Sequence, residues 1–209
     1  MRILFSLFLI LLLGACNRVH SDQPLFFATT APDAPRLRDG LWVIESGGDP
    51  CRFDVGKPVT RWPDCADWIL VRGGEILGYD APGKGDVTGT GEWTSIPYVL
   101  ASGSPLILQI AVSDEGKLDY QFFGLERATG VDADIAAFAS WPVQCGPPPP
   151  PAPQGEKPRH VTLEPLPGMI LKDDSCTTSS AAAVRAAAGP SRGWAEDPGK
   201  ARWVRAGYP

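Results

Sequence analysis

The chain has 209 residues, with 24 acidic and 19 basic side chains and a formal net charge of −5 at neutral pH. This modest acidic balance, with nothing that resembles a basic groove, argues against a nucleic-acid partner. Beyond the first residues, no segment is apolar enough to span a membrane as a helix.

The N-terminus has the pattern of an export signal. Met1-Arg2 supplies a short positive region, and the run from Ile3 to Leu13 is apolar apart from Ser6. The run is too short for a bilayer-spanning helix, which needs roughly 20 residues, but suits the core of a signal peptide. We therefore expect residues 1–15 to be a cleaved signal peptide.

Leu13-Gly14-Ala15-Cys16 resembles the lipobox of bacterial lipoproteins. The resemblance implies that Cys16 becomes the mature N-terminus and carries acyl chains such as palmitate, which together make a durable membrane anchor. Asn17, rather than Asp, after this cysteine implies sorting to the outer membrane, facing the periplasm. The alternative is an ordinary cleaved signal peptide followed by a chance cysteine.

A lipidated Cys16 followed by a flexible tether is predicted over residues 16–36. This stretch is polar, contains three prolines and lacks an amphipathic period. Leu25-Phe26-Phe27 is its one apolar interruption, and the alternative is that this cluster docks on the following domain.

A mainly β domain is predicted over residues 37–146, where short apolar runs alternate with Gly, Asp and Pro. Gly73-Gly74 predicts a tight hairpin turn between two strands, because glycine adopts positive φ readily. The other expected elements are an opening strand at 41–45, a hairpin of 106–112 with 118–126 whose Leu118, Tyr120 and Phe122 face inward, and a short helix at 132–139. The expected fold is a small antiparallel β-barrel or sandwich.

A proline-rich spacer is predicted at residues 147–158, followed by a C-terminal segment, 159–209, that packs on the β domain. Within it we expect a strand near 161–163 and a short, mostly alanine helix, capped by Thr177 or Thr178 and stopped by Gly189-Pro190. Such a helix is marginal alone, so Trp194, Trp203 and a terminal strand at 201–205 are expected to anchor the segment.

Four further cysteines remain, an even number that predicts two disulfides in an oxidising compartment: Cys51, Cys65, Cys145 and Cys176. Three pairings are possible. Cys51 with Cys65 and Cys145 with Cys176 is favoured, because these bridges close a proline-rich connection and clamp the spacer. A metal site is not expected, because the cysteines lack close ligand spacing and both histidines, His20 and His160, lie far from them.

The sequence predicts no catalytic residue and no cofactor. Pairs of acidic residues occur at expected turns, where Asp is favoured for backbone hydrogen bonding: Asp64 with Asp67, Asp114 with Glu115, Asp132 with Asp134, and Asp173 with Asp174. A Ser-His-Asp site would have to be built on His160. Gly78 to Gly85 approaches a phosphate-binding loop, but Gly85 stands where Ser or Thr is needed.

Trp62 lies in the loop between Cys51 and Cys65, and an exposed aromatic platform for a sugar, peptide or partner is a hypothesis for this side chain.

Gly40-Leu41-Trp42 on the first predicted strand resembles the G-x-W opening of lipocalins. The same opening, followed by two cysteines, is also similar to small periplasmic β-barrel inhibitors of bacterial metalloproteases. Both resemblances imply a β-barrel.

The sequence as a whole predicts an envelope lipoprotein that acts as a non-catalytic binding or structural module. Its expected partners are the membrane, through the lipid anchor, and another envelope protein or peptidoglycan. The alternatives are a carboxylate-based hydrolase and a lipocalin-like carrier of an apolar ligand.

Overall fold

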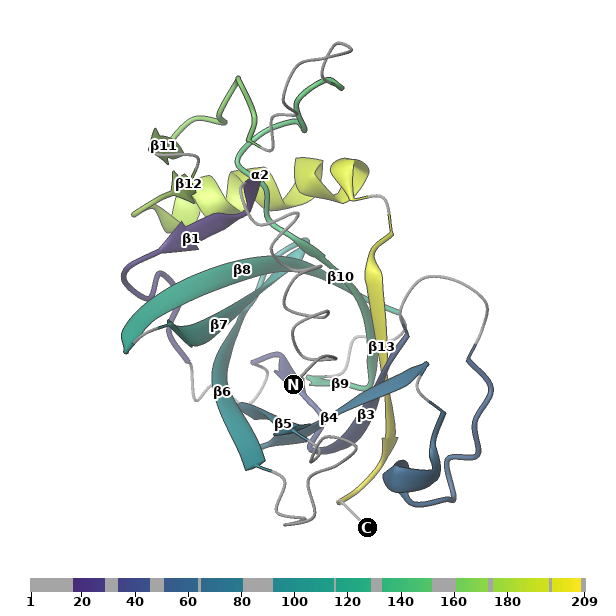
Figure 1. Ribbon diagram of the computed structural model, residues 1–209. Coiled ribbons are helices and arrows are strands. Elements are labelled where there is room, and N and C mark those ends of the chain that lie inside the picture. Colours follow the sequence, from purple (N-terminus) through teal and green to yellow (C-terminus); the bar gives the residue numbers. More distant parts are fainter. Residues whose placement is uncertain are drawn as a thin grey trace.

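The computed structural model describes residues 17–28, 34–45, 51–63, 65–80, 92–114, 116–128, 133–151, 161–172, 175–195 and 197–207. The fold is mainly β and centres on an eight-stranded antiparallel barrel (Figure 1), which confirms the predicted class. In the described residues no helix is long and apolar enough to cross a membrane.

The barrel wall closes through its last strand. Its members are, in order around the wall, β3 (Gly40–Glu45), β4 (Ala66–Arg72), β5 (Glu75–Asp80), β6 (Glu92–Ala101), β7 (Leu106–Asp114), β8 (Lys117–Arg127), β10 (Ala137–Pro142) and β13 (Gly199–Arg205). β13 pairs with β10 on one side and with β3 on the other. The C-terminal segment is therefore part of the wall, and closure removes the exposed sheet edges that an open sheet would present.

Short elements extend the wall. β1 (Val19–Ser21), β12 (Ser175–Thr177) and β11 (Ile170–Lys172) continue the sheet outward from β8. The remaining described elements are a parallel pair of β2 (Arg36–Leu37) with β9 (Asp134–Ile135), the 3-10 turn η2 (Val59–Arg61) and the helix α2 (Ala181–Trp194).

The flexible tether predicted for residues 16–36 is wrong over residues 17–28. β1 pairs with β8 and β12, Asn17 and Val19 are buried, and Phe26 is buried against Phe122 at a ring-centroid distance of 6.1 Å. Local composition did not reveal this because the order comes from strand pairing with segments far away in the chain. The alternative, docking of the Leu25-Phe26-Phe27 cluster on the domain, is thus observed for Leu25 and Phe26, whereas Phe27 stays exposed.

Alternate residues of the wall, together with Leu37 of β2 and Ile135 of β9, fill the barrel interior. The buried members are Leu37, Trp42, Val71, Leu100, Leu106, Leu108, Leu125, Ile135, Phe138 and Ala201. Trp42 is fully buried and packs on Phe138 with the ring centroids 5.5 Å apart. Its indole N–H donates to the carbonyl of Arg38 at 2.8 Å. Gly40 has φ of 131°, and a Cβ there would lie 2.3 Å from the carbonyl oxygen of Arg205. The glycine and the tryptophan of the G-x-W string therefore both serve packing at one end of the barrel.

Two further apolar clusters lie outside the wall. One holds α2 and β1 against the outer face of β8 and β10 (Figure 1), and it includes Val184, Ala187 and the disulfide-bonded Cys176. The other lies beneath the 51–65 loop and includes Leu41 and Val43 of β3. Strands of this barrel are thus apolar on both faces where an outer layer covers them.

The structure confirms one of three local predictions and contradicts the other two. The Gly73-Gly74 hairpin is confirmed, with φ of 58° and 88°. The helix predicted at 132–139 is wrong, because that stretch forms β9 and β10, where pairing with β8 and β13 outweighs local helix propensity. The inward row on β8 is also wrong: Leu118 is exposed, and Phe122 lies in the outer cluster beneath α2.

Helix α2 begins and ends later than its sequence predicts. Its N-cap is Ser180, whose side chain accepts the N–H of Ala183 at 3.2 Å, rather than Thr177 or Thr178. It also continues through Pro190. The carbonyls of Ala187 and Ala188 on the turn before the proline are bonded by the Ser191 hydroxyl at 2.8 Å and by the Trp141 indole at 2.7 Å. Pro190 has no N–H to donate to the carbonyl of Ala186, and these two bonds hold the neighbouring carbonyls of the same turn.

Candidate functional site

The barrel wall is split along part of the seam between β6 and β7. The two strands pair from Tyr98 to Ala101 of β6 with Ile110 to Ile107 of β7. Beyond this, residues 92–97 pair with β5 alone and residues 111–114 with β8 alone, among the described residues. Figure 1 shows that one end of β6 runs away from β7 and β8. The strands therefore diverge and open a wedge in the wall.

A groove of about 490 Å³ occupies this wedge, which we call the seam groove. Its two sides are residues 94–97 of β6 and residues 111–113 of β7, and the segment 24–28 forms its rim. Phe27 and Leu118, which are 74% and 51% exposed, both line it. Large apolar side chains that stay exposed around a concave surface are typical of ligand and partner sites.

Gln109 fixes the rim. Its side chain is buried, its oxygen accepts the N–H groups of Leu25 at 2.8 Å and Phe26 at 3.0 Å, and its nitrogen donates to the carbonyl of Phe26 at 3.0 Å. A single side-chain amide thus pairs with the rim as a neighbouring strand would. Phe26 is buried by this docking, whereas Phe27 is left exposed at the groove.

Tyr98 joins the seam groove to the barrel interior. It lines the groove and packs against the interior cluster. Burial raises the pKa of its phenol, so the ring stays neutral through the physiological range. The wall of the groove nearest the core is consequently uncharged.

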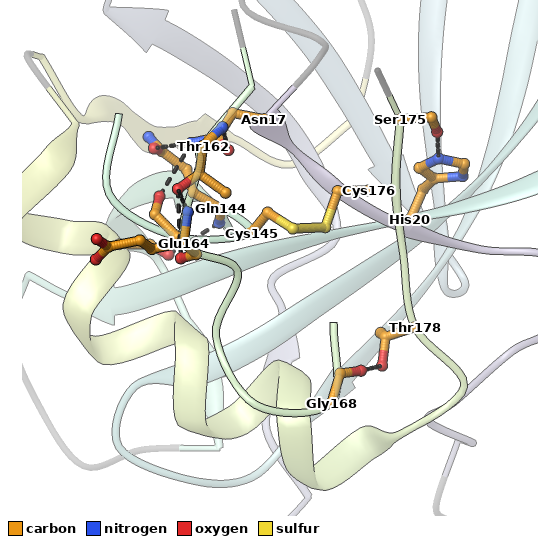
Figure 2. Close-up of a disulfide and its surroundings, with 12 residues drawn as sticks. Asn17, His20, Gln144, Cys145, Thr162, Glu164, Gly168, Ser175, Cys176 and Thr178 are labelled. Carbon is orange, nitrogen blue, oxygen red and sulfur yellow. Dashed lines mark hydrogen bonds between the residues drawn. A yellow bond between two sulfur atoms is a disulfide. The ribbon is translucent and has the colours of Figure 1, made fainter. Parts of the chain in front are cut away.

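A second group of polar side chains lies on the sheet extension. Nδ1 of His20 is 2.9 Å from Oδ1 of Asp119, and its Nε2 is 2.5 Å from Oγ of Ser175. Figure 2 shows the bond between His20 and Ser175 beside the Cys145–Cys176 disulfide. The three side chains come from β1, β8 and β12, so the strand order β8–β1–β12 brings them together.

The four cysteines predicted to form disulfides do so. Cys51 pairs with Cys65 and Cys145 with Cys176, with Cα separations of 5.7 and 6.0 Å. Cys145 and Cys176 are fully buried, and their bridge joins the chain two residues before the proline spacer to β12. This bridge therefore holds the C-terminal segment next to β1.

Trp62 is not an exposed platform, and that hypothesis is wrong. Its side chain is 9% exposed, packs on Phe53 with the two rings tilted and their centroids 4.5 Å apart, and donates its indole N–H to the carbonyls of Asp54 and Lys57, both at 3.1 Å. The disulfide-closed loop folds onto the outer face of β3 and β4, so Trp62 becomes the core of that loop.

Some residues that the sequence singles out lie outside the part of the chain that the structure describes. Cys16 and His160 lie outside the described residues, as does at least one side chain of each acidic pair. Within the described part of the chain, no three His, Cys, Asp or Glu residues form a group suited to a metal ion.

The sequence did not single out the residues that line the seam groove or the His20 group. Asp119 is 99 and Ser175 is 155 positions from His20, and the sequence predicts a tether at His20. The only signals were the Leu25-Phe26-Phe27 cluster and the presence of a histidine in a chain that has two.

Comparisons with protein-family models, with curated proteins and with solved structures give no match to this chain.

Proposed function

We propose that this protein is a lipid-anchored ligand-binding module of the bacterial envelope, and that its seam groove holds an extended apolar ligand such as a fatty acyl chain. The observation that carries the proposal is the groove itself, which opens between two diverging barrel strands and is rimmed by the exposed Phe27 and Leu118. Its volume of about 490 Å³ is suited to one small ligand.

The edge of β6 favours an acyl chain over a peptide strand. The backbone N–H of Tyr98 points toward β5, where it donates to the carbonyl of Gly74 at 3.1 Å. Because backbone polar groups alternate sides along a strand, those of Ser95 and Pro97 face the seam instead. Proline has no N–H to donate, so this edge is poorly equipped to pair with an added strand. Apolar contact alone suffices for an acyl chain, at about 0.8 kcal/mol per buried CH₂.

Fluorescence titration with a fluorescent fatty acid analogue tests the proposal. The full chain carrying Cys16→Ser is used, so that neither attached acyl chains nor detergent compete. Leu118→Gln and Phe27→Gln should each weaken binding by about 10-fold, because each removes about 1 to 2 kcal/mol of apolar contact. Ile170→Gln is the matched control: Ile170 is 58% exposed, on β11, and does not line the groove. Unchanged affinity in both groove variants would refute the assignment.

The envelope location rests on the lipobox-like residues 13–16. Cys16→Ser should release the protein from membranes, and mass spectrometry of the N-terminal peptide should show acyl chains on Cys16 in the unmodified chain. Retention of the variant on membranes after a high-salt wash would overturn the anchor.

If Cys16 is lipidated, the folded body rests directly on the membrane. Asn17 is buried in the fold, and consecutive Cα atoms are about 3.8 Å apart, so no tether separates the lipid from the domain. Leu163 is 57% exposed and follows Thr162, which is bonded to Asn17. A Leu163→Trp variant in vesicles should therefore show extra fluorescence quenching by brominated lipid relative to the unsubstituted chain. Equal quenching would show that this side chain does not reach the lipid.

A further inference from the structure

We propose that Ser175, His20 and Asp119 form a separate chemical site, in which Ser175 is an activated nucleophile toward small carboxylic esters. The three residues lie on the sheet extension β8–β1–β12 and do not line the seam groove. This activity is therefore additional to the proposed binding of an apolar ligand and independent of it.

The hydrogen bonds fix the tautomer of His20. An ionised carboxylate only accepts hydrogen bonds, so Nδ1 of His20 carries the proton that is donated to Asp119. In the neutral ring Nε2 is then an acceptor, and the Ser175 hydroxyl donates to it. A nucleophile bonded to a base that is itself oriented by a third group is the signature of an activated hydroxyl.

These side chains occupy the accessible face of the extension. Val19 and Cys176, the strand neighbours of His20 and Ser175, point the other way and are buried in the cluster under α2. The side chains of His20 and Asp119 are 29% and 28% exposed. An ester can therefore approach Ser175 from solvent, while the buried face and the adjacent disulfide keep the strands in register.

Lys172 adds a positive charge next to the nucleophile. It is exposed on β11 and lies directly opposite Ser175 in the antiparallel ladder, so both side chains project from the same face. The four strands thus present Asp119, His20, Ser175 and Lys172 in order. An ammonium group in this position favours the negative charge that develops on a carbonyl oxygen under attack.

The proposed reaction is an ester hydrolysis that needs only water as a co-reactant. Oγ of Ser175 attacks the ester carbonyl, and its proton passes to Nε2 of His20. The tetrahedral intermediate collapses, the bond to the alcohol oxygen breaks, and the alcohol leaves with that proton. Water then attacks the acyl-serine with His20 again accepting the proton, and the carboxylic acid is released as Ser175 recovers its hydrogen.

Labelling of the full chain with a fluorophosphonate tests the site, because such a probe is attacked by the activated serine with loss of fluoride. Peptide mass mapping should place the adduct on Ser175. His20→Gln and Asp119→Asn should each slow labelling by at least about 10-fold, in line with the usual contribution of a general base. Asp119→Glu restores a carboxylate and should recover part of the rate, which separates a positioning role from a purely structural one.

Thr177→Ala is the matched control, because Thr177 lies on the same face of β12, two residues beyond Ser175, and stands opposite His20 in the register. It should label at the rate of the unsubstituted chain. The proposal is overturned if no adduct forms on Ser175, or if His20→Gln, shown by circular dichroism to be folded, labels as fast as the unsubstituted chain.

Discussion

The backbone N–H of Thr162 donates to Oδ1 of Asn17 at 3.1 Å, although the two residues are 145 positions apart. The amide nitrogen of Asn17 also donates to the carbonyl of Gly146 and to Oε1 of Gln144, both at 3.0 Å. Figure 2 shows this group beside the Cys145–Cys176 disulfide. One buried side chain thus connects the first described residue to both sides of the proline-rich spacer.

Asn17→Ala should lower the free energy of unfolding by about 2 to 4 kcal/mol, because it leaves the Thr162 N–H and the Gly146 carbonyl without their partner. Urea unfolding followed by tryptophan fluorescence measures the change. Gln23→Ala, at an exposed position shortly after β1, is the control and should change stability by less than about 0.5 kcal/mol. A loss below 1 kcal/mol for Asn17→Ala would show that water replaces these bonds.

The two disulfides should contribute unequally. On the chain-entropy model, removing Cys145–Cys176, with a sequence separation of 31, costs about 3.7 kcal/mol, and removing Cys51–Cys65, with a separation of 14, costs about 3 kcal/mol. Thermal unfolding of the paired Cys→Ala variants checks the order. The 145/176 variant should melt lower, since it also loosens β12 and the helix layer. The reverse order would mean that the 51–65 loop stabilises the barrel more than its length implies.

The sequence predicted those turns and strands whose formation depends on residues adjacent in the chain. The Gly73-Gly74 turn follows from two adjacent glycines between apolar runs, and the terminal strand near 201–205 from its own apolar pattern. Its placement between β10 and β3, which closes the barrel, depends on pairing with distant strands. The β class could thus be predicted, whereas the closure could not.

Neither candidate site could be predicted, because each depends on strand register. The seam groove exists because β6 and β7 stop pairing beyond Tyr98 and Ile110, and no local motif marks that point. His20 meets Asp119 and Ser175 because β1 inserts between β8 and β12, and only one of its three residues, Val19, is strongly apolar. Such a strand carries too little periodicity to be distinguished from a linker.

Gly124→Ala should displace α2 from the barrel. A Cβ at this position would lie 2.5 Å from the indole of Trp141, whose N–H is bonded to the carbonyl of Ala188 on α2. The clash should cost about 1 to 3 kcal/mol, and hydrogen exchange should rise in residues 184–194. Gly78→Ala on β5 is the control, because a Cβ there meets nothing within 4 Å. Unchanged exchange in α2 would show that Trp141 moves aside without loosening the helix.

Tyr98→Phe should flatten the fall of stability at alkaline pH. Burial raises the pKa of Tyr98 in the folded protein, so the unfolded chain, with an ordinary value of about 10, releases this proton first as pH rises. The phenol therefore contributes stability that is fully present below about pH 10 and is lost as pH rises toward the higher folded value. Urea unfolding from neutral pH to above about pH 10 should show that the free energy of unfolding falls more steeply for the unsubstituted chain than for Tyr98→Phe. At neutral pH the variant should differ only by the lost hydrogen bond between the Tyr98 hydroxyl and the backbone of Leu37, about 1 kcal/mol. If the free energy of unfolding changed equally with pH in the two chains, the phenol of Tyr98 would be exposed to water in the folded state.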